Sequence, residues 1–185
     1  PDYGNPGIEA STGSLGHGVS FAAGKALYFK RKNRKNKVVC LISDGELNEG
    51  STWEGILFAS HHKLSNLTII VDNNKWRSFG KSIDVINLHP LKKTFQGFDL
   101  TISDINGHNF SEICKSLNKK TNKPKIIIAN TIKGKGISFM ENNLTWHYKS
   151  LDETELNKAI NEIKNEKYIH KNTYQVSKKK IKIFF

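Results

Sequence analysis

Two oxygen-rich segments of the chain have the residue types of a site for a hard divalent cation. Asp44 and Gly45 follow a short apolar run, and Asn73 and Asn74 follow a second one. Mg²⁺ prefers oxygen ligands and commonly takes only a few from the protein, with water and phosphate supplying the rest. If the two runs form neighbouring strands, Asp44 and Asn74 can share one Mg²⁺ that carries a diphosphate. An Asp-Gly pair alone is usually a turn, so the prediction depends on the two segments occurring together.

Gly45 adds a place for an anion beside this cation. It has no side chain, so a bulky anion can approach its backbone N–H closely. Helical spacing begins soon after it, and the free N–H groups at a helix start favour negative charge. The two segments together therefore predict a site for a metal-bound diphosphate.

The apolar residues alternate between strand-like runs and helix-like spacing. Strands are expected in four segments: 38–42, 67–71, 98–105 and 125–130. Helices are expected in four others, the last with Asp152 as N-cap: 14–30, 52–63, 109–119 and 152–167. This alternation predicts an α/β fold, a doubly wound and mostly parallel sheet with helices on both faces. In such sheets ligands bind beyond the carboxyl ends of the strands, where Asp44 and Asn74 lie.

Composition narrows the class of protein. Apolar residues make up 37% of the chain, enough for a packed core. The net charge of +12 is densest over residues 30–37, but no aromatic residues are interleaved there for base stacking. We therefore favour a solvated basic loop over a nucleic-acid surface. No apolar run approaches the roughly 18 residues of a membrane span. Cys40 and Cys114 do not form a disulfide framework, which makes the cytoplasm the expected compartment.

One domain is expected over residues 1–167. The chain opens without a signal peptide, on a segment typical of the middle of a domain, so we expect the upstream part of that domain to be missing. Residues 168–185 are basic and lose the apolar periodicity, and they are expected to form a disordered tail.

Three segments carry a resemblance to a known family. Ser43-Asp44-Gly45 through Asn73-Asn74 resembles the Gly-Asp-Gly and Asn-Asn motif of thiamine diphosphate enzymes. Residues 10–18 resemble the glycine-rich cofactor loop of transketolases, and residues 128–147 resemble their loop that brings a histidine to the diphosphate. The resemblance covers residues 1 to about 165 and points to the N-terminal, thiamine diphosphate-binding subunit of split, two-chain transketolases.

The resemblance implies roles at the diphosphate end of the cofactor. Mg²⁺ would be held by Asp44, by the side chain of Asn74 and by the backbone carbonyl of Trp76. The N–H of Gly45 would meet the diphosphate, beside Asn74. His147 would bind the diphosphate and help proton transfer near the reacting carbon.

The resemblance also implies the other end of the site, the activity and the partner. Gly13, Ser14 and Leu15 would line the cofactor's two rings, and Glu49 would lie at a subunit interface. The reaction would transfer a two-carbon ketol unit from a ketose phosphate to an aldose acceptor, as in the pentose phosphate pathway. The family's activating glutamate comes from a pyrimidine-binding domain, which we expect on a separate C-terminal subunit. Self-association is also expected, and we expect the family's upstream cofactor-contacting histidine to belong to the missing upstream part.

Two other functions remain open. One is a different thiamine diphosphate enzyme of the same fold, such as a deoxyxylulose-phosphate synthase or a ketoacid dehydrogenase component. The loop at 11–16 and the pair Trp146-His147 oppose it. The second is a catalytically dead remnant or a structural subunit, which the set of Asp44, Asn74 and His147 opposes.

The chain departs from the family pattern at three positions. Ser43 stands where the motif has its first glycine, Tyr148 stands where glycine usually follows Trp-His, and Trp76 replaces a commonly smaller apolar residue. The second change leaves the acceptor sugar open. His17 lies close to the expected cofactor loop and could act there. Structural roles are expected for four other histidines: His61, His62, His89 and His108.

Overall fold

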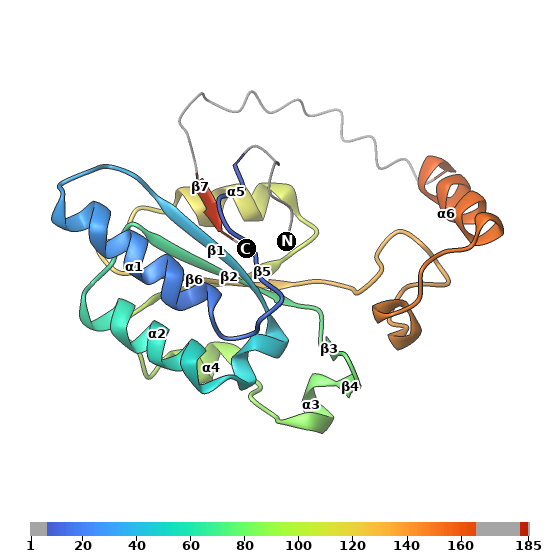
Figure 1. Cartoon of the computed structure of the whole chain (residues 1–185), viewed down its shortest axis with the longest axis horizontal. Coiled ribbons are helices and arrows are strands. Elements are labelled where there is room, and N and C mark those ends of the chain that lie inside the picture. The colour runs from blue at the N-terminus through green and yellow to red at the C-terminus, as the bar shows by residue number, and fades with distance from the viewer. Residues whose placement is uncertain (1–6, 166–181, 185) are drawn as a thin grey trace.

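The centre of the molecule is a parallel sheet of five strands. The computed structural model describes residues 7–165 and 182–184. The strand order is β5-β6-β2-β1-β7, and each neighbouring pair runs parallel (Figure 1). The strands are β1 (Val38–Ser43), β2 (Leu67–Asn73), β5 (Thr101–Asn106), β6 (Lys125–Asn130) and β7 (Lys182–Phe184). The predicted fold class is confirmed.

Helices cover both faces of this sheet. Helices α1 (Gly18–Arg31), α2 (Gly50–His61) and α4 (Leu91–Phe95) pack on one face, and α5 (Phe110–Asn118) packs on the other (Figure 1). Strand β6 shows why two cores form. Ile126 and Ile128 belong to the core under α1 and α2, whereas Ile127 belongs to the core under α5. Successive side chains point to opposite faces, so a continuous apolar run is buried on both.

The direction of the chain reverses between β2 and β6. The connection from β1 to its neighbour β2 passes through α2, and that from β5 to its neighbour β6 passes through α5 in the opposite sense. Because such crossovers are right-handed, the two helices must cover opposite faces. The reversal leaves a crevice beyond the carboxyl ends of β2 and β6, the usual ligand position in open parallel sheets.

Shorter elements surround this edge of the sheet. A 3₁₀ helix, η1 (Asp44–Asn48), follows β1 directly. After β2 the chain forms a small antiparallel hairpin, β3 (Trp76–Arg77) with β4 (Gly80–Lys81), and then α3 (Ser82–Val85). Beyond β6, η2 (Leu144–His147) and α6 (Glu153–Asn165) lie on an arm that extends away from the sheet (Figure 1).

The structure refines several predicted boundaries. Helix α1 begins at Gly18 rather than at residue 14, because Gly16 has φ +83°, which no α-helix accommodates. Strand β5 begins at Thr101 rather than at residue 98. Asp152 caps the start of α6, because its Oδ1 accepts the Glu155 N–H at 2.8 Å.

The C-terminal residues 168–185 are expected from the sequence to form a disordered tail. Residues 182–184 instead form β7 beside β1, and the other residues of this segment lie outside the described residues. Within 7–165 and 182–184, no helix is long and apolar enough to cross a membrane.

Candidate functional site

The two predicted metal-binding segments follow adjacent strand ends. Strands β1 and β2 pair in register, with Ile42 opposite Val71 and Ser43 opposite Asp72. Asp44 is the next residue on one side, and the segment from Asn73 onwards is next on the other. The predicted arrangement of the two strands is therefore confirmed, and both segments begin at the same edge of one sheet.

Asp44 is a buried carboxylate in which one oxygen accepts a side-chain hydrogen bond and the other accepts none. Its side chain is 2% exposed, and its Oδ2 accepts the hydroxyl of Ser82 at 2.5 Å. Its Oδ1 is buried and has no hydrogen-bond partner among the described residues. Burial raises the pKa of Asp44, while the Ser82 hydrogen bond, the nearby charge of Arg77 and the backbone N–H of Lys75 oppose that shift.

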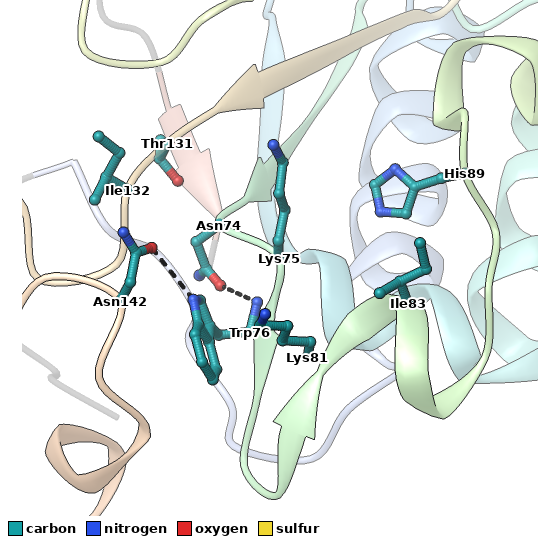
Figure 2. A pocket seen from close by; sticks show the side chains of 9 residues that line it. All are labelled: Asn74, Lys75, Trp76, Lys81, Ile83, His89, Thr131, Ile132 and Asn142. Carbon is teal, nitrogen blue, oxygen red and sulfur yellow. Dashed lines mark hydrogen bonds between the residues drawn. The ribbon is translucent and has the colours of Figure 1, made fainter.

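The segment after β2 turns sharply at this edge. Asn74 Oδ1 accepts the backbone N–H of Trp76 at 2.9 Å, and Lys75 between them has φ +68°. An Asn side chain that bonds the backbone two residues on is a typical turn former. The Trp76 indole N–H donates to Asn142 Oδ1 at 3.3 Å, which links this turn to the loop after β6 (Figure 2).

Gly45 is fixed by contacts on either side. Its carbonyl accepts Nη1 of Arg77 at 3.3 Å. Ser43, which replaces the motif's first glycine, caps η1, because its hydroxyl accepts the Glu46 N–H at 3.3 Å. A Cβ on Gly45 would lie 3.3 Å from that hydroxyl, so a larger residue would be crowded there. The departure at Ser43 thus supplies a cap instead of disturbing the strand end.

A pocket of about 690 Å³ lies at the crevice where the chain reverses. Figure 2 shows the loop after β6 on one side of it and α3 with the following loop on the other, with the turn after β2 between them. Asn74 and Trp76, predicted from the sequence, line it. Seven lining residues were not predicted as site residues: Lys75, Lys81, Ile83, His89, Thr131, Ile132 and Asn142.

Two histidines with expected structural roles differ in where they lie. His89 lines the pocket. No spacing pattern marks it, and only the fold brings its loop to this edge. His108 does have a structural contact, since its Nε2 accepts the Ile132 N–H at 2.8 Å and so positions the loop after β6.

The predicted ring-binding loop lies beside η1. Gly13, Ser14 and Leu15 are exposed and do not line the pocket. The next residue, Gly16, ties this loop down: its N–H donates to Glu46 Oε1 at 3.1 Å, and its carbonyl accepts the hydroxyl of Ser51 at 3.0 Å. Burial raises the pKa of Glu46, and the Gly16 N–H opposes that shift. The loop is therefore held to the segment that follows Asp44.

His147 and Glu49 are exposed and stand apart from the pocket lining. His147 lies in η2 on the arm, with its ring 4.8 Å from that of Tyr148. Glu49 lies on the surface between η1 and α2. The predicted roles of these two residues concern partners outside this chain or the cofactor, and they stay predictions.

The donor set fits a hard divalent cation with few protein ligands. Within the described residues, no group of three or more His, Cys, Asp or Glu side chains could hold a metal. In that same part of the chain, one buried carboxylate oxygen without a partner, at Asp44, is the donor that a divalent cation would satisfy. A site with so few protein donors suits a metal that arrives with phosphate oxygens.

Curated relatives of known name match most of this chain. A subunit of apulose-4-phosphate transketolase from Actinobacillus succinogenes is 40% identical over 163 residues, covering 87% of this chain and 59% of that protein. A 6-deoxy-6-sulfo-D-fructose transketolase subunit from a Clostridium species is 37% identical, covering 86% and 59%. Human transketolase is 37% identical, covering 84% and 25%. The chain thus spans little more than half the length of the subunits it matches.

A solved structure and a family model agree with these relatives. The crystal structure of transketolase from Campylobacter jejuni superimposes with a TM-score of 0.79 at 34% identity, covering 85% of this chain and 26% of that one. The model of the transketolase thiamine diphosphate-binding domain matches residues 1–183. The motif order, the parallel sheet and these matches have one explanation: the chain belongs to the transketolase family, as its thiamine diphosphate-binding domain.

Proposed function

We propose that this chain is the diphosphate- and metal-binding half of a transketolase that transfers a two-carbon ketol unit from a ketose phosphate to an aldose. The observation that carries the proposal is the buried Oδ1 of Asp44, which no group in the described part of the chain satisfies, beside the turn at Asn74. A buried carboxylate oxygen without a partner is costly unless a cation satisfies it. The chain belongs to the transketolase thiamine diphosphate-binding domain family, so we propose that this cation binds together with the diphosphate of the cofactor.

In this proposal the metal is Mg²⁺ and three groups hold it. Asp44 contributes its free oxygen, Asn74 the second lone pair of an oxygen already bonded to the Trp76 N–H, and Trp76 its backbone carbonyl. Gly45 offers its N–H to the diphosphate, held in place through its carbonyl by Arg77. These groups anchor the charged end of thiamine diphosphate, and the bound cofactor supplies the carbanion chemistry.

The remaining predicted residues act around this anchor. Gly13, Ser14 and Leu15 would line the ring end of the cofactor, at the loop that Gly16 ties to η1. His147 would hydrogen-bond the diphosphate and move a proton near the reacting carbon, from its place in η2 on the arm.

The proposal includes a second subunit. Two of the relatives are named as transketolase subunits, and this chain spans 59% of their length. We place the pyrimidine-binding domain and its activating glutamate on a separate C-terminal chain. Helices α1 and α2 expose four apolar side chains that offer a surface for this second subunit or for self-association: Phe21, Tyr28, Leu57 and Phe58. Glu49, the predicted interface residue, directly precedes α2.

The sugars and the compartment are proposed at the level of class. One relative is named for apulose 4-phosphate and another for 6-deoxy-6-sulfo-D-fructose, both ketoses that carry an anionic group. We expect this chain to act on ketoses and aldoses of that anionic kind. Cys40 and Cys114 are both free, as is usual in the reducing cytoplasm, where we place the protein.

The test is cofactor binding measured by calorimetry with Mg²⁺ and the second subunit present. Asp44→Ala should abolish Mg²⁺-dependent binding of thiamine diphosphate while leaving the fold intact. The matched control is Asp84→Ala, which removes an exposed aspartate of α3. Unchanged cofactor affinity in Asp44→Ala would contradict the proposed function.

A further inference from the structure

We propose that Ser82 is a positioning residue of the metal site: its hydroxyl fixes the Asp44 carboxylate so that the second carboxylate oxygen stays available to the cation. This inference rests on the metal site proposed above and adds a residue that no motif of the sequence indicates. Ser82 lies 38 positions after Asp44, at the start of α3.

The hydrogen bond between the two side chains is buried. Ser82 and Asp44 are each 2% exposed, and Ser82 Oγ donates to Asp44 Oδ2 at 2.5 Å. The other oxygen, Oδ1, has no partner within the described part of the chain. A carboxylate held through one oxygen cannot rotate freely, so its remaining oxygen has a fixed direction. That is the arrangement a metal-binding carboxylate needs, because ligands of this kind are themselves hydrogen-bonded by neighbours.

The backbone of Ser82 connects the same side chain to the second half of the site. Its N–H donates to the carbonyl of Lys75 at 3.0 Å, and Lys75 lies between Asn74 and Trp76. A single residue thus touches the segment after β1 through its hydroxyl and the segment after β2 through its backbone. Any displacement of Ser82 would change the distance between the proposed ligands.

Arg77 of the adjoining hairpin provides a second connection. Its Nη1 donates to the carbonyl of Gly45, the residue after Asp44, at 3.3 Å. The hairpin β3–β4 and the start of α3 therefore hold the Asp44-Gly45 turn from one side, with Arg77 on the backbone and Ser82 on the carboxylate. Because Arg77 bonds the Gly45 carbonyl, the side-chain donor to the Asp44 carboxylate is the neutral hydroxyl of Ser82.

A neutral donor suits a metal ligand for an electrostatic reason. A lysine or arginine bonded directly to Asp44 would neutralise the charge that attracts the cation. A serine hydroxyl supplies one O–H donor and adds no charge. Ser82 can therefore orient the carboxylate without adding a further positive charge to that of Arg77 nearby.

The experiment measures Mn²⁺ binding by electron paramagnetic resonance, with the full chain, its second subunit and a fixed concentration of thiamine diphosphate. Loss of a hydrogen bond that orients a metal ligand typically costs about 10- to 100-fold in metal affinity. Ser82→Ala should weaken Mn²⁺ binding within that range. Ser78→Ala, in the turn between β3 and β4, is the matched control and should bind as the wild type does.

Ser82→Thr and Ser82→Val separate orientation from packing, because the two side chains have nearly the same shape and only threonine has a hydroxyl. Threonine should retain tight Mn²⁺ binding and valine should lose it, even if Ser82→Ala folds poorly. Equal Mn²⁺ affinity in the threonine and valine variants would overturn the role of Ser82.

Asp44→Ala distinguishes failure of this inference from failure of the proposed function. If Asp44→Ala loses Mn²⁺ while Ser82→Ala and Ser82→Val retain it, the metal site stands and only the role of Ser82 is wrong. If Asp44→Ala binds Mn²⁺ as tightly as the wild type, the metal site itself is wrong and the inference falls with it.

Discussion

Asp44 and Cys40 lie four positions apart on β1 and η1, and burial changes the acidity of both. Burial raises the pKa of Asp44, and the donors around it oppose the shift. Burial, together with the nearby charge of Glu46, raises the pKa of Cys40 to about 12. Asp44 thus has compensating neighbours that suit a functional carboxylate, whereas Cys40 is a structural thiol of the core.

The thiols should accordingly differ in reactivity. Only the thiolate attacks alkylating reagents, and at pH 8 a thiol with a pKa of about 12 is almost wholly protonated. Cys114 is partly exposed, so iodoacetamide should label it in the folded protein while Cys40 stays unmodified. Peptide mass spectrometry after labelling at pH 8 checks this, with the chain in urea as the control in which both react. Rapid labelling of native Cys40 would contradict the buried position of β1.

Helices α1 and α2 pack so closely at Gly55 that a side chain at this position would collide with α1. A Cβ on Gly55 of α2 would lie 2.9 Å from Val19 Cγ1 and 3.3 Å from the backbone nitrogen of Ser20, both on α1. Both helices pack into the same core on one face of the sheet, and α2 begins just after η1. The position of the Asp44-Gly45 turn therefore depends on this helix pair.

Two helical glycines give opposite predictions for stability. Gly55→Ala should lower the free energy of unfolding by about 1–3 kcal/mol, because the helices must move apart. Gly24→Ala, on the exposed side of α1 where a Cβ meets nothing within 4 Å, should raise it by about 0.5–1 kcal/mol, since alanine is the better helix former. Urea unfolding followed by circular dichroism measures both. A stabilising Gly55→Ala would mean that the two helices are not in close contact.

The chain presents one end of the proposed cofactor site and exposed apolar side chains on its surface. Phe21 on α1 is 62% exposed and Leu57 on α2 is 59% exposed. The arm that bears His147 extends away from the sheet (Figure 1). These features are typical of a subunit whose surfaces are completed by another chain.

The chain alone should therefore lack ketol-transfer activity. Glu46 and Glu49 follow Asp44 closely in the sequence, and the Glu46 carboxylate is already occupied by the N–H of Gly16. We expect neither to replace the glutamate of the pyrimidine-binding domain, so acid–base help worth about 10²- to 10⁴-fold should be missing. A coupled ketol-transfer assay on the purified chain, with and without a subunit that carries the pyrimidine-binding domain, tests this. Substantial turnover by the single chain would refute the half-site interpretation.

The layers of the fold, and the two strand ends that Asp44 and Asn74 follow, were predictable from the sequence. Runs such as 38–42 and 67–71 indicate burial on both faces, and the residues after them had to share one edge once the strands were parallel. The same local patterns led to the correct cap at Asp152. Each of these features depends on the periodicity or the residue types of one short segment.

The walls of the pocket, in contrast, come from contacts between distant segments. The placement of β2 beside β6 brings Thr131 and Asn142 to the same pocket as Trp76. The fold also brings His89 to the pocket wall and the Ser82 hydroxyl onto Asp44, across 38 positions of chain. No local pattern marks these residues, because their positions follow from strand order, crossover handedness and packing. The chemistry of the site is therefore local at Asp44 and Asn74, and its geometry is set by contacts far along the chain.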